Sequence, residues 1–209
     1  MWEKLQTLTD MTAGIIPLML LLFTVALAVI IERLYFFHKV LSQGAAMERE
    51  LKRVPYRGVD ELRAVAGRNT GALQSALVNA ALDSQSTDAD AMERHVDETI
   101  LETVPAMDKH LWVLDTAVTL GPLMGLLGTI FGMIKTFDVL GGDGLGAGAK
   151  AVTGGIGEAL VATGIGLFIA IVGLIFLNYF NKRVRLGVHQ LELIKLTLVN
   201  RMHGGGAKG

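Results

Sequence analysis

Three long apolar segments alternate with polar, amphipathic sequence along this chain of 209 residues. The segments are 15–31, 111–137 and 159–180; the first and third carry no charge, and the second carries none from 116 to 134. A helix rises about 1.5 Å per residue and the bilayer core is about 30 Å thick, so about 20 apolar residues cross it. The pattern predicts an all-α, polytopic membrane protein with three transmembrane helices.

The first segment is interpreted as an uncleaved span. Its apolar stretch is longer than the core of a typical signal peptide, and Glu32 and Arg33 follow where a cleavable peptide needs small residues.

The polar sequence between the first two segments predicts helices. Apolar residues recur there every three or four positions, which is the period of one helical face, and Ser86, Thr87 and Asp88 offer N-capping side chains. The stripe runs into the second apolar segment, so we expect one long helix, bent at Pro105 or Pro122. The third segment also continues as an amphipathic helix beyond Lys182. The two stripes are Met92, Val96, Ile100, Val104, Met107 and Leu111, and Val184, Val188, Leu191, Leu198 and Met202.

The distribution of Lys and Arg predicts the topology. Basic residues near the segment ends gather in 32–110 and 181–209, whereas the opposite side holds few. We therefore expect an outward N-terminus (1–14), a cytoplasmic helical loop (32–110), an outward periplasmic link (138–158), and a cytoplasmic C-terminal helix and tail (181–209). The glycine-rich stretch 141–148 is interpreted as a linker, since no Gly-Lys-Ser/Thr follows it.

Composition narrows the function classes. The chain is 51% hydrophobic and 19% charged, with a mean hydropathy of +0.47, and its net charge of −1 argues against a nucleic-acid partner. It has no cysteine and no Walker motif, and its histidines lack metal-ligand spacing. We predict no enzymatic activity, cofactor or metal. The histidines are His38, His95, His110, His189 and His203.

Glycines are spaced by four, three and four in the second apolar segment, at Gly121, Gly125, Gly128 and Gly132. They share one helical face, and two of the intervals match the small-xxx-small pattern that lets helices approach closely in membranes. The face is interpreted as a helix-packing surface. It can also line a narrow pore.

Polar side chains are few in the apolar segments, and two readings of them stay open. Thr129 and Thr163 either bond back to the carbonyl one turn earlier, or form part of a polar ring, because both are predicted at comparable depth in the outer half of the bilayer. Glu158, in the first turn of the third segment, either complements the helix dipole or takes part in proton transfer.

The segments have no ionisable group at their centres. Proton relays through membranes use ionisable side chains. If this chain conducts protons, the titrating carboxylate must therefore come from a partner.

Three stretches resemble the MotA/TolQ/ExbB proton-channel family. They are PLMLLLFTVALAVIIERL (17–34), LGPLMGLLGTIFGMIKTF (120–137) and GIGEALVATGIGLFIAI (155–171). The GLLGT and GxxEALxATxxGL motifs carry the resemblance, which covers all three segments in the family's order.

The resemblance implies a homo-oligomer, pentameric in the ExbB and MotA groups, enclosing a single-span partner (ExbD, TolR or MotB) that supplies a membrane aspartate. The family's pathway threonines map onto Thr129 and Thr163, and its glutamate maps onto Glu158. The implied role is the channel subunit of a proton-driven motor in the bacterial inner membrane, surrounded by lipid.

Several functions remain open at this point. Three spans rather than four disfavour a MotA-like stator. The IIERL ending of the first segment looks more like ExbB than TolQ, which favours energising TonB-dependent outer-membrane transport together with a TonB-like protein, over a TolQ-like role in the Tol-Pal system. A solute carrier working alone would need polar groups at the midplane. A structural scaffold would explain the glycines but not the threonines.

Overall fold

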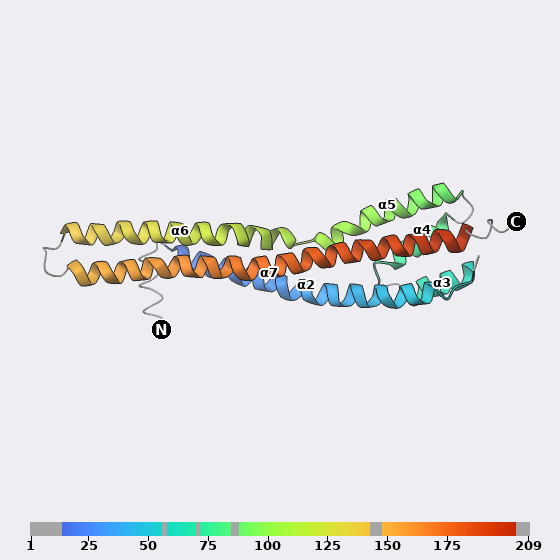
Figure 1. The fold of residues 1–209 in the computed structure, drawn as a ribbon, viewed down its shortest axis with the longest axis horizontal. Helices are drawn as coiled ribbons and strands as arrows, with labels where there is room; N and C mark the ends of the chain where they lie inside the picture. Colours follow the sequence, from blue (N-terminus) through green and yellow to red (C-terminus); the bar gives the residue numbers. More distant parts are fainter. Residues whose placement is uncertain (1–13, 56–57, 70–71, 85–87, 143–147, 204–209) are drawn as a thin grey trace. The chain divides into compact units, whose positions relative to one another are not determined.

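The computed structural model describes residues 14–55, 58–69, 72–84, 88–142 and 148–203. They form six helices and no strand (Figure 1). The predicted outward N-terminus up to residue 13, the centre of the glycine-rich link and the tail 204–209 lie outside the described residues. The helices are α2 (Ile15–Leu51), α3 (Val59–Arg68), α4 (Ser75–Asp83), α5 (Ala89–Asp108), α6 (Leu111–Gly142) and α7 (Gly148–His203).

Three helices are long and apolar enough to cross a membrane: α2, α6 and α7. This confirms the predicted all-α fold with three spanning helices. The third segment continues without a break, as its stripe predicts, because α7 is 56 residues long and buries Leu191, Ile194, Leu198 and Met202 beyond the apolar part.

The described residues fall into two compact units. The apolar unit comprises 14–31 and 110–179, and the amphipathic unit comprises 32–109 and 180–203. The division falls within α2, between Ile31 and Glu32, and within α7, between Tyr179 and Phe180. These points lie at the ends of the first and third apolar segments, where the side chains change from uniformly apolar to amphipathic.

The amphipathic unit is held by heptad-like stripes. On α2 the buried positions Phe37, Val40, Met47 and Leu51 are spaced by three, seven and four residues, so they share one face. Phe37 stacks on Phe180 of α7, with the ring centroids 5.9 Å apart. Full burial of each such side chain stabilises the unit by about 1.5–3 kcal/mol.

Helix α5 packs in the same unit through the predicted stripe. Met92, Val96, Ile100 and Met107 are buried, and Asp88 caps the helix by accepting a hydrogen bond from the Ala89 backbone N–H at 2.9 Å. Across the unit, Lys195 of α7 forms ion pairs with Asp97 at 2.8 Å and Glu93 at 3.1 Å. The apolar face of α5 is buried and its acidic residues Glu93 and Asp97 pair with Lys195, which accounts for the amphipathic pattern of this part of the sequence.

The predicted continuous helix from the loop into the second apolar segment is wrong. Both prolines lie inside helices, Pro105 in α5 and Pro122 in α6, and the break comes at Lys109 and His110 instead. His110 has a φ of +67°, in the left-handed region that ends helices. A proline does not have to break a helix when neighbouring groups satisfy the freed carbonyls.

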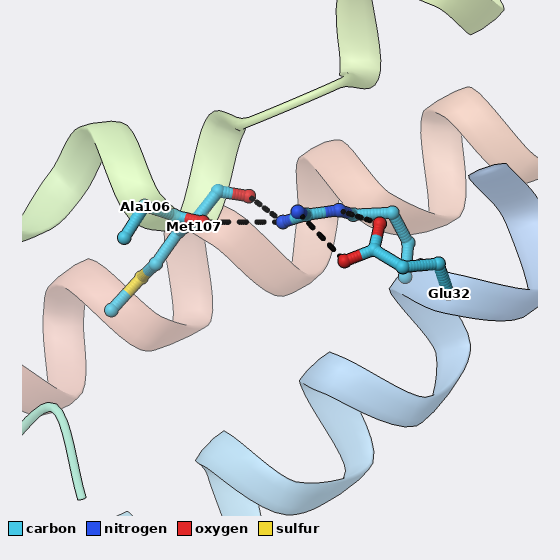
Figure 2. Close-up of polar contacts among 4 residues, drawn as sticks. Glu32, Ala106 and Met107 are labelled. Carbon is cyan, nitrogen blue, oxygen red and sulfur yellow. Dashed lines mark hydrogen bonds and ion pairs between the residues drawn. The ribbon is translucent and has the colours of Figure 1, made fainter.

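The end of α5 is held by Arg33 from α2, which is only 2% exposed. Its guanidinium donates to the carbonyl oxygens of Ala106 at 3.2 Å and Met107 at 3.3 Å, two of the last four carbonyls that a helix leaves without partners. It also binds both carboxylate oxygens of Glu32, at 2.8 and 3.0 Å. Figure 2 shows these hydrogen bonds, with the Glu32 carboxylate on one side of the guanidinium and the Ala106 and Met107 carbonyls on the other. The local break is thus stabilised by a distant side chain.

The left-handed backbone at His110 gives a first prediction. His110→Gly and His110→Ala both remove the imidazole, but only glycine adopts a positive φ without steric cost. We expect the His110→Gly protein to be more stable than the His110→Ala protein by about 1 kcal/mol, measured by thermal unfolding in detergent. Equal stability of the two variants would show that this backbone is unstrained.

Candidate functional site

The candidate site lies in the apolar unit, where α6 and α7 pack against each other through the predicted glycine face. Gly121, Gly125, Gly128 and Gly132 are all buried. A Cβ added at Gly121 would lie 2.8 Å from the backbone carbonyl oxygen of Gly166. The backbones of the two helices therefore approach each other directly at this point. The four positions therefore act as a packing surface within one chain.

Gly166 of α7 belongs to this surface and was missed by the sequence analysis. A Cβ on Gly166 would collide with the Gly121 carbonyl and lie 3.1 Å from the Gly125 Cα. The sequence pattern indicates this role, because Gly166 lies seven residues after Ala159 and four after Ala162. This spacing places the three small residues on one helical face.

Thr163 uses its hydroxyl across the helix pair. It donates to the Gly125 carbonyl oxygen at 3.0 Å, and not to its own helix one turn earlier. A Cβ on Gly125 would lie 2.9 Å from the Thr163 Cα, so the glycine brings the two backbones within hydrogen-bond reach. The threonine oxygen keeps its lone pairs for a further donor.

Thr129 behaves differently from Thr163. It donates to the carbonyl oxygen of Leu126, three residues earlier in its own helix, at 2.7 Å. This is the local bonding common for threonine in membrane helices. The hydroxyl hydrogen is occupied while the oxygen can accept.

The register of the two helices sets the heights of the threonines. Gly125 is opposite Thr163 and Gly132 is opposite Ala159. Thr129 is four residues beyond Gly125, and one residue beyond Gly128, which is opposite Ala162. It therefore lies about 3–6 Å farther along the axis than Thr163, depending on which facing pair sets the level. The two hydroxyls differ in height by about half a turn to one turn.

Both threonines lie on the same flank of the helix pair. Thr129 follows Gly128 and Thr163 follows Ala162, and these two preceding residues face each other. One residue turns a helix by about 100°. Because α6 and α7 run antiparallel, moving one residue toward the C-terminus rotates the side chain toward the same side of the pair on both helices. The structure thus brings Thr129 and Thr163 together on what we call the threonine flank.

Glu158 lies on the other flank. Glu158 comes one residue before Ala159, which faces Gly132. The threonines come one residue after a residue of the contact face, so Glu158 is rotated about 100° from that face in the opposite direction. Phe168 turns the same way as Glu158 and contacts Phe23 of α2, with ring centroids 5.8 Å apart. The Oε2 atom of Glu158 is buried and accepts no hydrogen bond from the described residues. Its carboxylate is therefore separated from the two hydroxyls.

A buried hydroxyl that the sequence analysis passed over is Thr136, which is 4% exposed and donates to the Gly132 carbonyl oxygen at 2.7 Å. It extends the polar groups of α6 by two turns beyond Thr129. Among the described residues, no group of three or more His, Asp or Glu side chains could hold a metal ion.

The sequence matches the model of one family over residues 48–193, described as the MotA/TolQ/ExbB proton channel family. The chain belongs to this family. As a MotA/TolQ/ExbB protein with three helices able to cross a bilayer, it is a multi-pass membrane protein.

Curated relatives place the chain nearest to ExbB within the MotA/TolQ/ExbB family. It is 30% identical over 187 residues to biopolymer transport protein ExbB-like 3 of Synechocystis, covering 88% of each chain. It is 30% identical to ExbB-like 1 of the same organism, covering 75% of this chain and 63% of the relative. It is also 27% identical to biopolymer transport protein ExbB of Neisseria gonorrhoeae, covering 86% of each chain.

Proposed function

We propose that this chain is the channel-forming subunit of an inner-membrane motor that uses the proton gradient to energise TonB-dependent outer-membrane transport. The single observation that supports it best is the threonine flank, where Thr129 and Thr163 lie on one side of a tightly packed α6–α7 pair. The names of the curated relatives, biopolymer transport protein ExbB, favour this role over a TolQ-like one.

The proposal includes a partner. Hydroxyls can pass a proton along but do not titrate near neutral pH, and the apolar cores of the spans hold no acid. We propose that a single-span protein of the ExbD or TolR kind supplies a membrane aspartate beside the threonine flank, and that copies of this chain, five in number, surround it. A TonB-like protein would receive the resulting motion.

The proposed topology places the N-terminus in the periplasm and the amphipathic unit in the cytoplasm. Its support is the excess of Lys and Arg near the membrane ends of that unit, among them Arg33, Lys109 and Lys182. Glu158 would then lie near the periplasmic end of α7. We include Glu158, one of whose carboxylate oxygens is buried, in the proposed pathway at its periplasmic end, on the flank opposite the two hydroxyls.

Proton flux through proteoliposomes that contain the chain and its co-purified single-span partner tests the function. Thr163→Val keeps the shape of the side chain but removes the hydroxyl, and Thr129→Val does the same on α6. A lost hydrogen bond of about 1.4 kcal/mol in the rate-limiting state slows transfer about tenfold. We expect each variant to lose about that much flux and the double variant to lose more.

A matched control is Thr24→Val on α2. Thr24 is exposed and donates to the Leu20 carbonyl oxygen of its own helix at 2.8 Å, so it resembles Thr129 in bonding but lies on another helix. Its flux should equal that of the unchanged protein. Normal flux in both the Thr129→Val and the Thr163→Val proteins would remove the threonines from the pathway.

A further inference from the structure

The amphipathic unit has an apolar groove on its surface, between α5 and the C-terminal part of α7 (Figure 1). The groove has a volume of about 500 Å³, and all of its lining residues belong to this one unit. We call it the α5–α7 groove. Its apolar lining residues are Ile100, Leu101 and Val104 of α5 with Val188 and Leu196 of α7.

Two leucines of the α5–α7 groove are open to the outside. Leu101 is 73% exposed and Leu196 is 52% exposed. Both lie in the amphipathic unit, beyond the three apolar segments that lipid would cover. Large apolar side chains that gather on a surface facing water mark a contact with another molecule, because burial removes them from water.

Carboxylates surround the apolar floor of the groove. Asp97 and Glu192 are among its lining residues. The base that lines it, Lys195, is only 15% exposed and already pairs with Asp97 at 2.8 Å and with Glu93 at 3.1 Å. Helix α5 as a whole has six carboxylates and one arginine, so its net charge is −5 with the histidine counted as neutral. The groove therefore combines an apolar floor with an acidic border.

These two properties define the chemistry of the occupant. A polypeptide segment that carries apolar side chains on one face and Lys or Arg beside them would cover the leucines and meet the carboxylates. Anionic lipid headgroups would be repelled by the acidic border. Two copies of the same groove would bring like charges together, which disfavours them as each other's cover. The surface thus favours a basic, amphipathic segment.

The place of the groove along α7 indicates where such a segment would come from. Val188 and Leu196 follow Phe180, the end of the third apolar segment, by eight and sixteen residues. At about 1.5 Å per residue, the groove lies about 12–24 Å beyond that end. The Lys and Arg that orient a single membrane span lie on its cytoplasmic side, within about 15–20 residues of its end. The basic flank of a single-span protein therefore reaches the depth of this groove.

We propose that the α5–α7 groove binds the basic cytoplasmic segment of the single-span partner. This inference rests on the proposed function, which supplies that partner and the cytoplasmic location of the amphipathic unit. Apolar side chains of the segment cover Leu101 and Leu196, and its Lys or Arg side chains meet Glu192. The contact lies outside the membrane and uses none of the residues of the threonine flank. It holds the cytoplasmic end of the partner to a subunit of the channel.

Photo-crosslinking from the groove tests this contact. The photoreactive residue p-benzoylphenylalanine replaces Leu101 in the full chain, which is produced together with its partner and irradiated in native membranes. We expect a product with the mass of one chain plus one partner, and peptide mass spectrometry should place the link in the basic segment next to the partner's span. A product that joins two copies of this chain, or the absence of any product, would overturn the proposal.

The matched control carries the photoreactive residue at Leu186. Leu186 is also an exposed leucine of α7, at 45%, but it comes two residues before Val188 and so points about 200° away from it around the helix. We expect no link to the partner from this position. Equal yields from Leu101 and Leu186 would show that the partner does not select the groove.

Charge reversal tests the basic chemistry of the segment. Glu192→Lys replaces attraction by repulsion at an exposed position, so the yield of the link from Leu101 should fall about fivefold. Asp60→Lys makes the same change at an exposed position of α3 that does not line the groove, and its yield should equal that of the unchanged border. An undiminished yield in Glu192→Lys would exclude recognition of a basic segment.

Failure of this inference and failure of the proposed function are distinguishable. Proteoliposomes that conduct protons with the partner present, but give no link from Leu101, overturn the groove contact and leave the function standing. A chain that co-purifies with no single-span protein and conducts no protons overturns both.

Discussion

Gly121→Ala and Gly166→Ala are each expected to destabilise the α6–α7 pair by about 1–3 kcal/mol, the usual cost of overpacking a close contact. The added methyl group of Gly121→Ala would lie 2.8 Å from the main-chain oxygen of Gly166. Because the neighbour is backbone and not the end of a flexible side chain, the helices must move apart. Thermal unfolding in detergent measures the loss.

The matched control for these variants is Gly154→Ala. Gly154 also lies on α7, but a Cβ built there meets nothing within 4 Å. Without a steric cost, the higher helix propensity of alanine should stabilise this variant by up to about 1 kcal/mol. If all three variants behaved alike, the glycine face would not be a close backbone contact.

Separation of α6 from α7 should also weaken the hydrogen bond of the Thr163 hydroxyl. The Thr163 hydroxyl donates to the Gly125 carbonyl only because these two backbones approach closely. We therefore expect Gly121→Ala to lower proton flux without changing any polar side chain. The position of the threonines in the proposed pathway thus depends on the close contact at the glycine face.

Arg33→Ala is expected to destabilise the amphipathic unit by about 2–4 kcal/mol, because it removes charge-assisted hydrogen bonds and a buried side chain together. The Ala106 and Met107 carbonyls lose their donor, so the last turn of α5 should fray. Limited proteolysis should then cleave near Lys109, and thermal unfolding should report the loss of stability.

The variants at Arg33 have a matched control on the same helix. Arg49 is exposed, and among the described residues its hydrogen bond is to the Ala45 carbonyl of its own helix at 3.1 Å. Arg49→Ala should therefore change stability by less than about 0.5 kcal/mol. Arg33→Lys keeps the charge but not the planar fork, and should rescue the unit only in part. Full stability of Arg33→Lys would mean that the charge alone matters.

Much of this fold could be read from the sequence because it depends on properties of single helices. The three spans follow from the length and hydropathy of their segments. The buried stripe Met92, Val96, Ile100 and Met107 follows from period alone. The face of Gly121, Gly125, Gly128 and Gly132 was also predicted as a packing surface, since spacing by threes and fours places residues on one side of any helix.

The tertiary structure decided what depends on two helices at once. The break at Lys109 and His110 is stabilised by Arg33, which is 73 residues before Ala106 in the sequence, and no local pattern shows such a partner. The prolines were the stronger local signal for a bend, and they were misleading.

Only the packing of α6 on α7 determined which polar groups meet. Spacing within α7 places Glu158 and Thr163 in neighbouring turns, but the antiparallel register turns the threonine toward Thr129 and the glutamate toward the opposite flank. Hydropathy and periodicity describe one helix and its faces. Which atoms lie within hydrogen-bond distance depends on the height and rotation of a second helix, and these are set by the close contact of Gly121, Gly125 and Gly166.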